Sequence, residues 1–237
     1  MTFTTGKRVL ELLADGDRTP ATGPDYALSD VTLLEPILRP PAIFCIGRNY
    51  AAHIAELGNE KPAKPIVFLK LPLSSAPPGG PVLTPTASEA LDYEAELVLV
   101  IGANHEIAGY AVANDVSARD LQRSEGQWAR AKGFDTSCPW GPWITTADEL
   151  TDPLGLRITT HVNGEIRQDG NTRDLIFGPR EIVDFIGEAC TLEPGAIVLT
   201  GTPSGVGEAF DPPRYLQRGD TVRCEIEALG VIEHPIA

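Results

Sequence analysis

The hydrophobic positions in the middle of the chain fall into two short runs separated by a turn. Residues 97–101 read Leu-Val-Leu-Val-Ile, and residues 109–113 begin a second extended segment. β-branched and aliphatic runs of this length favour buried strands. Gly102 and Asn104 lie between them, where a chain reverses direction readily. We therefore expect a hairpin of two strands that folds near His105.

Other apolar runs along the chain are equally short. Asn49 is a candidate helix cap and Gly58 a helix stop, which would delimit a short helix after the preceding strand. The 23 glycines and 21 prolines favour many turns. We predict a mixed α+β fold that is predominantly β, with a few short flanking helices. The expected strands are residues 43–47 and 196–199, and the expected helices are residues 7–14, 50–57 and 179–189.

The first forty residues carry one modest helix and a turn-rich stretch, and they end at Pro40 and Pro41. The residue before a proline is pushed out of the helical region, so a boundary is expected here. We predict a small N-terminal cover segment over residues 1–40 and one catalytic domain over residues 41–237. A chain of 237 residues, 42% of them hydrophobic, is long enough to bury such a core.

Charge and composition narrow the range of partners. The formal net charge of −14 argues against nucleic acids and anionic membranes. No apolar run approaches the ~20 residues that a membrane-spanning helix needs, and no signal peptide is expected at the start of the chain. The four cysteines lie far apart without a C-x-x-C pair, which favours reduced thiols. We expect a cytoplasmic protein that binds a small molecule.

The hairpin also carries the densest set of acidic side chains. Glu94 and Glu96 are two residues apart, so in a strand they project to the same side. Two like charges held this close repel each other unless a cation lies between them. The returning strand of the hairpin would bring Asp115 beside them. Three carboxylates suit Mg²⁺, Mn²⁺ or Ca²⁺ better than zinc; the alternative is a set of solvated charges on a polar sheet face.

His53 and Glu56 form a second candidate group on the expected short helix. They are three residues apart and therefore lie on one helical face. A carboxylate beside an imidazole fixes its tautomer and raises its basicity, which a general base acting on water requires. An ordinary surface pair is the alternative at this spacing.

Seven segments after residue 40 resemble motifs of the fumarylacetoacetate hydrolase family in their order and spacing. They read G-R-N-Y-A-A-H-I-A-E (47–56), P-I-V-F-L-K (65–70), D-Y-E-A-E-L (92–97), N-D-V-S-A-R-D-L-Q (114–122), K-G-F-D-T-S-C-P-W-G-P (132–142), V-N-G-E-I-R-Q (162–168) and L-T-G-T-P-S-G-V-G (199–207). Each segment is weakly specific alone, but together they are very specific. The resemblance implies a β fold rolled around a metal, and a homodimer.

The resemblance also implies roles for the two groups of acidic residues. In that family the two glutamates of the E-x-E motif and the first aspartate of N-D-x-S-A-R-D bind a divalent cation. By position these are Glu94, Glu96 and Asp115, and the implied cation is Mg²⁺ or Mn²⁺. The family's water-activating dyad falls on His53 and Glu56.

Basic and amide side chains near these groups are candidates for substrate binding. An anionic substrate would be repelled by three carboxylates around a dication unless basic groups compensate. Arg119 offers a planar fork for a carboxylate, and Lys132 a point charge for a developing enolate oxygen. Asp115, Arg119 and Gln122 are expected on one face of a helical turn that begins after Asp115. Structural ion pairs with Asp120 and Asp135 are the alternative for the two cations.

Three further residues are candidates for recognition of a substrate carboxylate. Thr202 lies in the glycine-rich segment 199–207, and the resemblance implies that its hydroxyl donates to the substrate, although a tight turn would also explain the glycines. Arg48 and Lys70 are candidates for a distal carboxylate. Residues 74–81 and 210–217 depart from many relatives of the family and could border the pocket.

The resulting hypothesis is a metal-dependent enzyme for small 2-oxo or 2,4-dioxo acids. Water activated by the dyad would cleave a C–C bond through a metal-stabilised enolate, as in an acylpyruvate hydrolase. The same enolate chemistry would serve an oxaloacetate-type decarboxylase or a 2-hydroxyhepta-2,4-diene-1,7-dioate isomerase of aromatic catabolism, so the sequence does not choose among them. A metal-stabilised binding protein is the non-enzymatic alternative.

Overall fold

The two central apolar runs form an antiparallel hairpin in the computed structural model, which describes residues 9–17 and 26–237. β5 (Ala95–Ile101) pairs with β6 (Ile107–Asn114), and the turn between them contains the 3-10 segment Ala103–His105. Every residue of β5 is buried. An aliphatic strand of this kind is stable only when both faces of its sheet are covered. The predicted hairpin and its turn near His105 are confirmed.

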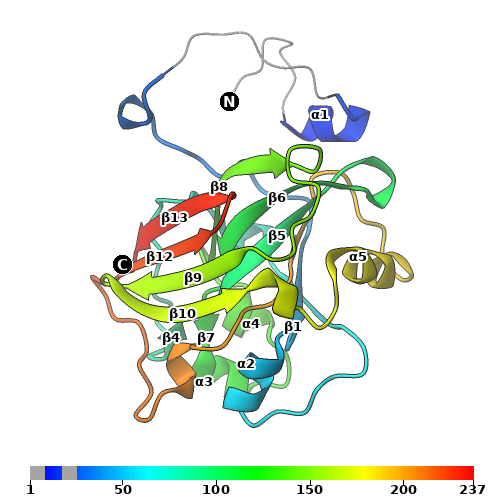
Figure 1. Cartoon of the computed structure of the whole chain (residues 1–237). Helices are drawn as coiled ribbons and strands as arrows, with labels where there is room; N and C mark the ends of the chain where they lie inside the picture. Colours follow the sequence, from blue (N-terminus) through cyan, green and yellow to red (C-terminus); the bar gives the residue numbers. More distant parts are fainter. Residues whose placement is uncertain (1–8, 18–25) are drawn as a thin grey trace.

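The hairpin lies inside a larger sheet, and a second sheet covers one of its faces. Within the described residues, the main sheet has the strand order β2-β1-β11-β5-β6-β8-β3, and the second has the order β10-β9-β12-β13. Figure 1 shows the second sheet lying across β5 and β6. The other strands of the main sheet are β1 (Ile43–Gly47), β2 (Ile66–Lys70), β3 (Ser75–Ala76), β8 (Cys138–Thr146) and β11 (Ile197–Leu199). The strands of the second sheet are β9 (Arg157–Val162), β10 (Glu165–Asn171), β12 (Thr221–Ile226) and β13 (Gly230–Pro235). Separately, β4 (Leu91–Asp92) pairs with β7 (Ser117–Ala118).

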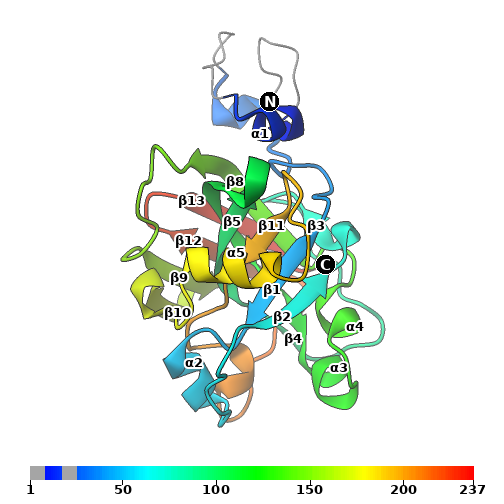
Figure 2. The ribbon, with the colours of Figure 1, turned by 90° about the vertical axis from the view of Figure 1, so that its right-hand side faces the viewer.

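Short helices flank the sheets, which confirms the mixed, predominantly β fold. They are α1 (Val9–Asp15), α2 (Ala51–Glu56), α3 (Arg119–Ser124), α4 (Ala129–Lys132) and α5 (Pro179–Gly187). Figure 2 shows α5 against the main sheet and α2, α3 and α4 gathered at the opposite end from α1. The expected helix at residues 7–14 is present from Val9 onward; Lys7 and Arg8 lie outside the described residues. The division between residues 1–40 and 41–237 stays a prediction.

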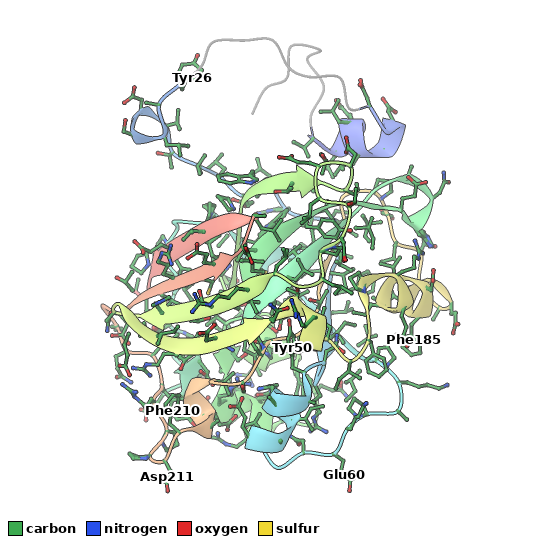
Figure 3. All side chains as sticks on the ribbon, in the orientation of Figure 1. Tyr26, Tyr50, Glu60, Phe185, Phe210 and Asp211 are labelled. Atoms are coloured by element: carbon green, nitrogen blue, oxygen red, sulfur yellow. The ribbon has the colours of Figure 1, made fainter. Side chains whose placement is uncertain are left out.

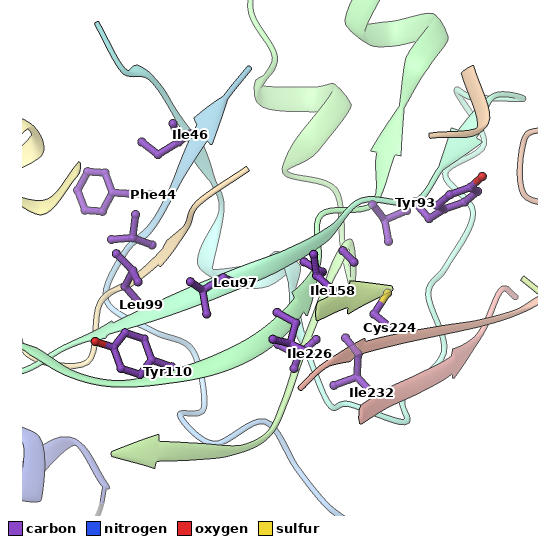
Figure 4. Packing of buried hydrophobic residues seen from close by; sticks show 14 of the residues in the cluster. Phe44, Ile46, Tyr93, Leu97, Leu99, Tyr110, Ile158, Cys224, Ile226 and Ile232 are labelled. Atoms are coloured by element: carbon purple, nitrogen blue, oxygen red, sulfur yellow. The ribbon is translucent and has the colours of Figure 1, made fainter. Parts of the chain in front are cut away.

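Alternation along β5 divides the core into two apolar clusters. Leu97 and Leu99 face the second sheet, where they join a cluster with Ile226 and Ile232 (Figure 4). Val98 and Val100 belong to a cluster on the opposite face. Because side chains alternate along a strand, Glu96 projects to the same side as Val98. The fold therefore directs the predicted metal ligands away from the interface between the two sheets.

Asn49 corrects one detail of the predicted helix. α2 spans only six residues, and its N-cap is Tyr50, without a side-chain hydrogen bond. The Asn49 amide instead donates to the carbonyl oxygens of Phe177 and Thr200, at 3.1 and 2.8 Å, and accepts from the Phe177 N–H at 2.8 Å. A buried amide with three such partners is held by the tertiary structure rather than by its own helix. These bonds tie the start of α2 to the strand end at Thr200.

His234 on β13 is expected to make the folded protein less stable in acid. It is fully buried, its Nε2 accepts from the Asn114 amide at 3.0 Å, and burial lowers its pKa to about 4. The unfolded chain takes up this proton at a higher pH than the folded chain does. The stabilisation from the neutral ring is therefore complete above about pH 6.5 and is lost as the pH falls through 4.

Protonation of His234 alone is expected to lower the free energy of unfolding by about 3 kcal/mol between pH 7 and pH 4. Urea unfolding at several pH values, with His234→Asn as the comparison, measures the effect. The variant should lose less stability on acidification than the wild type does. Equal losses would contradict the assignment.

Candidate metal centre and active site

Three buried carboxylates converge at the open end of the β5–β6 hairpin. One oxygen from each of Glu94, Glu96 and Asp115 lies within 4.8 Å of the others, and all three residues are buried. Glu94 directly precedes β5, and its carbonyl accepts the Asp115 N–H at 2.8 Å, which fixes the two chain ends side by side. The structure thus brings together the residues that the sequence predicts as ligands. Three oxygen donors suit a hard divalent cation.

Two of these carboxylates are compensated by buried cations. The Lys132 ammonium donates to Glu94 at 2.7 Å and to Asp115 at 2.9 Å, and Arg119 donates to the other Glu94 oxygen at 2.6 Å. Lys70 donates to the other Asp115 oxygen at 2.6 Å. Burial alone would raise the pKa of Glu94, but Lys132 and Arg119 outweigh it and lower this pKa to about 2. Glu94 therefore stays ionised at neutral pH.

Glu96 is the least compensated of the three carboxylates. It accepts the backbone N–H of Gly201 at 2.6 Å, and no side-chain cation of the described chain bonds to it. Burial, Asp115 and Glu94 raise its pKa well above the ordinary value. A divalent cation would relieve this repulsion, so the donor set and its charge fit such an ion. Gly201 has φ of 100°, and a Cβ there would lie 2.8 Å from the Asn49 Cβ, so the position that donates to Glu96 requires glycine.

The His53 and Glu56 side chains form a hydrogen-bonded pair on α2. His53 Nδ1 lies 2.7 Å from Glu56 Oε1, while Glu56 Oε2 accepts the Gly205 N–H at 2.7 Å. Glu56 is an acceptor, so it favours a proton on Nδ1 and leaves Nε2 with the lone pair. The imidazole is therefore oriented by a carboxylate that is itself anchored to the backbone.

The dyad and two of the three carboxylates, Glu94 and Glu96, line one cavity of about 520 Å³. This volume is in the range of small-molecule sites. The expected site residues on its wall are Arg48, His53, Glu56, Glu94, Glu96, Arg119, Gln122, Lys132 and Thr202. Asp115 and Lys70 are not on the wall; both are buried behind it. A ligand in this cavity would meet the histidine and the candidate metal ligands together.

Several predicted residues have positions that differ from those expected. Lys70 was a candidate for a distal substrate carboxylate, yet its ammonium is buried on Asp115 and the Val116 carbonyl. The Thr202 hydroxyl already donates to the Ala95 carbonyl at 2.9 Å and accepts from Gln168 at 2.8 Å. The Thr202 side chain lines the cavity, but its hydroxyl proton is already donated to the Ala95 carbonyl.

The segment that carries Arg119 also differs from the expected geometry. Its helix α3 begins at Arg119 itself rather than after Asp115. Arg119 still contacts Gln122, with Nη1 donating at 2.9 Å. The alternative ion pairs with Asp120 and Asp135 are absent from the described structure, because Arg119 and Lys132 pair with the carboxylates of the site instead.

Sequence reasoning missed Asp92, which supports the site from behind. Its carboxylate accepts from Arg119 Nε at 2.8 Å and from the N–H groups of Gly207 and Glu208 at 2.7 and 3.0 Å. It thereby joins the arginine to a loop that borders the cavity. The only signal in the sequence was its place in D-Y-E-A-E, two residues before Glu94. The cavity wall also includes Phe68, Arg123, Trp128 and Glu208, none of which was expected there.

The cysteines take no visible part in this site. All four are unpaired, which agrees with the expected reduced thiols. Burial raises the pKa of Cys138 to about 12 and raises that of Cys45 as well. Thiols that resist ionisation in this way are poor nucleophiles.

Among the described residues, no helix is long and apolar enough to cross a membrane.

The fold and the site combine a curled β-sheet with a cluster of three buried carboxylates at one end of its central hairpin. A family model described as fumarylacetoacetate (FAA) hydrolase C-terminal matches residues 42–237. The chain belongs to the fumarylacetoacetate hydrolase family, an enzyme family whose members bind divalent metal, and the resemblance found in the sequence is confirmed.

Individual relatives support the same assignment. Oxaloacetate tautomerase FAHD2A, mitochondrial, from Bos taurus is 41% identical over 95% of this chain and 78% of its own length. The crystal structure of 2-hydroxyhepta-2,4-diene-1,7-dioate isomerase from Mycobacterium marinum is 40% identical, with a TM-score of 0.80 over 92% of this chain and 82% of that one. A fumarylacetoacetate hydrolase from Exiguobacterium antarcticum has a TM-score of 0.85 at 36% identity, over 96% of this chain and 87% of that one.

Proposed function

We propose that this protein interconverts the enol and keto forms of a 2-oxo dicarboxylic acid, by proton transfer at the carbon beside the keto group. The observation that carries the proposal is the placement of the His53–Glu56 pair on one cavity wall with Glu94 and Glu96, two members of the carboxylate cluster. A base held opposite a site for a chelated 2-oxo acid is the arrangement that enolisation requires. We include Mg²⁺ or Mn²⁺ as the cation and a cytoplasmic location in the proposal.

The residues of the chain divide the reaction between them. A divalent cation held by Glu94, Glu96 and Asp115 would supply Lewis-acid polarisation of the 2-oxo group. In the keto-to-enol direction His53 Nε2 would take a proton from the adjacent carbon and deliver it to the former keto oxygen, and in the enol-to-keto direction it would move the proton from that oxygen back to the carbon. Glu56 would stabilise the imidazolium that forms between the two transfers. The Lys132 ammonium has its pKa raised by Asp115 and Glu94 in spite of its burial, so it stays charged and stabilises negative charge on the substrate oxygen.

Two readings of the same site compete, and we favour tautomerisation or isomerisation over acylpyruvate hydrolysis. Hydrolysis would use the same histidine to deprotonate water, so the dyad serves both. The bovine relative is named for oxaloacetate tautomerisation and the mycobacterial structure for isomerisation of a 1,7-dioate. Both names describe movement of a proton in a dicarboxylic acid, which supports the first reading.

An assay with two substrates tests the proposal. The enol form of oxaloacetate is followed by its ultraviolet absorbance, and acetylpyruvate is followed in parallel, each with Mg²⁺ and after addition of EDTA. We expect Mg²⁺-dependent acceleration of the enol-to-keto conversion, with slower cleavage of acetylpyruvate. Faster cleavage of acetylpyruvate would favour the hydrolase, and no acceleration of either reaction would refute the proposal.

A second copy of the chain is the proposed protein partner. β2 is an edge strand of the main sheet within the described residues, and Val67 and Leu69 on it project outward and are exposed. Leu71 and Leu73 extend the exposed apolar row, with Leu69 and Leu73 each 53% exposed. Contiguous apolar surface on an edge strand is unfavourable in water unless it is covered. We infer that this row lies in a dimer interface.

Leu69→Lys is expected to convert the dimer to a monomer, because it places a charge in the middle of the apolar row. Light scattering coupled to size-exclusion chromatography measures the mass of each species. Leu154→Lys, at an exposed leucine of the loop before β9, serves as the control and should leave the mass unchanged. A monomeric wild type, or a dimeric Leu69 variant, would contradict the assignment.

A further inference from the structure

The cavity wall carries an arginine that the proposed reaction leaves without a role. Arg123 lies beside Gln122 on α3, lines the cavity, and has a side chain that is 54% exposed. Its Nη1 bonds to the carboxylate of Glu208 and to the Tyr215 hydroxyl, the latter at 3.1 Å. Within the part of the chain that the structure describes, its Nε and Nη2 make no hydrogen bond. A fork of N–H groups is therefore still available at the cavity.

The three nitrogen atoms of the neighbouring Arg119 side chain already have hydrogen-bond partners within the protein. Its Nε bonds to Asp92, its Nη1 to Gln122 and its Nη2 to Glu94. It is 2% exposed, so a ligand carboxylate would have to replace an existing partner to bind it fully. Arg123 needs no such replacement. Arg48 also lines the cavity, but of these two arginines only Arg123 forms an ion pair among the described residues, which shows the kind of group that its position accepts.

Glu208 supplies that carboxylate from a rigid segment. Its backbone N–H and that of Gly207 are bonded to Asp92, and a Cβ on Gly207 would lie 2.4 Å from the Arg214 carbonyl oxygen. Two residues after Glu208, the ring of Phe210 packs against the guanidinium groups of Arg167 and Arg214, whose Cζ atoms lie 5.6 and 5.2 Å from the ring centroid. Figure 3 shows Phe210 and Asp211 at the end of the molecule that carries α2 and α3. The Glu208 side chain is 19% exposed and is held in place at the cavity.

From this arrangement we infer that Arg123 binds the second carboxylate of a dicarboxylic 2-oxo acid, and that Glu208 limits the affinity of that contact. The inference rests on the proposed function, which places the 2-oxo end of the ligand at the metal centre. The free edge of the guanidinium binds a carboxylate through two parallel N–H groups. The Glu208 carboxylate orients Arg123 through Nη1 and, as a like charge, repels the incoming carboxylate. Ligands with uncharged tails gain nothing from Arg123, so the pair sets the preference for dicarboxylates.

Matched ligand pairs separate this role from the chemistry at the metal. Calorimetric titrations of the Mn²⁺-loaded full chain would compare 2-oxoglutarate with 2-oxopentanoate, and 2-oxoadipate with 2-oxohexanoate. Each pair differs only in a terminal carboxylate, so the affinity ratio within a pair measures recognition of that group. The better-bound pair is then measured with the variants Arg123→Gln and Glu208→Gln. The glutamine at position 208 keeps an acceptor for Arg123 and removes the charge.

We expect the wild type to prefer the dicarboxylate, and Arg123→Gln to lower the affinity ratio by about 10- to 100-fold. Glu208→Gln should raise the ratio, by about 3- to 10-fold. Arg130→Gln, at an exposed arginine of α4 outside the cavity, is the matched control and should leave the ratio unchanged. Thermal unfolding of each variant shows that it is folded.

The outcomes separate this inference from the function on which it rests. If both ligands of a pair bind in a metal-dependent manner but Arg123→Gln leaves their ratio unchanged, the role of Arg123 is refuted and the proposed function stands. A lowered ratio in Glu208→Gln would refute the limiting role of Glu208. If no 2-oxo acid binds the metal-loaded wild type, the proposed function fails, and this inference fails with it.

Discussion

Replacement of His53 by alanine is expected to lower kcat for enol–keto interconversion by about 10²- to 10⁴-fold, the usual contribution of a positioned general base. His53 is held by Glu56 at 2.7 Å on the cavity wall, and no other imidazole of the described chain lines that wall. His53 is not part of the carboxylate cluster that is proposed to bind the cation, so the affinity of the protein for Mn²⁺ should change little. Steady-state kinetics with Mg²⁺ and calorimetric titration of Mn²⁺ measure the two effects separately.

Two further variants sharpen this prediction. Glu56→Gln keeps the shape of the pair but removes the charge that stabilises the imidazolium, so it should reduce kcat less than His53→Ala does. His161→Ala alters a histidine on β9 that does not line the cavity, and it should leave kcat unchanged. A His53→Ala variant with wild-type kcat would refute the assignment of the base.

Replacement of Glu96 by glutamine should weaken Mn²⁺ binding by at least about 100-fold, because it removes a charged ligand. The same change should stabilise the protein without metal by about 1–2 kcal/mol. Burial and the neighbouring acids raise the pKa of Glu96, so its ionisation opposes folding at neutral pH. The amide oxygen of glutamine can still accept the Gly201 N–H. A metal-binding role for Glu96 would therefore cost stability in the metal-free protein.

The sign of this effect can be checked by pH. The raised pKa means that the stabilising, protonated form of Glu96 is fully present below the ordinary carboxyl pKa, and that its contribution is lost as the pH rises. The unfolding free energy of the metal-free wild type should therefore drop more between pH 5 and pH 8 than that of Glu96→Gln. Glu233→Gln, at an exposed position on β13, is the control. A less stable Glu96→Gln in EDTA would contradict the account of the carboxylate cluster.

Parts of the site that depend on local periodicity could be predicted from the sequence. Strand alternation from residue 94 onward predicts Glu94 and Glu96 on one side, and the turn near His105 brings Asp115 beside them. Helical spacing likewise joined His53 to Glu56. In each case the partners are separated by one turn or one hairpin, so the geometry of the element alone brings them together.

The remaining contacts join segments that are far apart in the chain. The alternation along β2 places Lys70 on the inward side with Phe68, but only the tertiary structure shows that its partner there is Asp115. The contact of Arg123 with Glu208 spans 85 positions and depends on the loop that Asp92 anchors. Neither pairing follows from the period of a strand or helix. Glu208 therefore gave no signal in the sequence.

In the proposed reaction, His53 acts on a ligand held at the Glu94, Glu96 and Asp115 cluster. The most direct test of this role is deuterium exchange at C3 of oxaloacetate in D₂O, followed by NMR for the wild type with Mg²⁺, the wild type with EDTA, and His53→Ala with Mg²⁺. The account predicts fast exchange in the first sample and exchange at the rate of the protein-free control in the other two. Exchange that is equally fast after chelation, or without the imidazole, would contradict it.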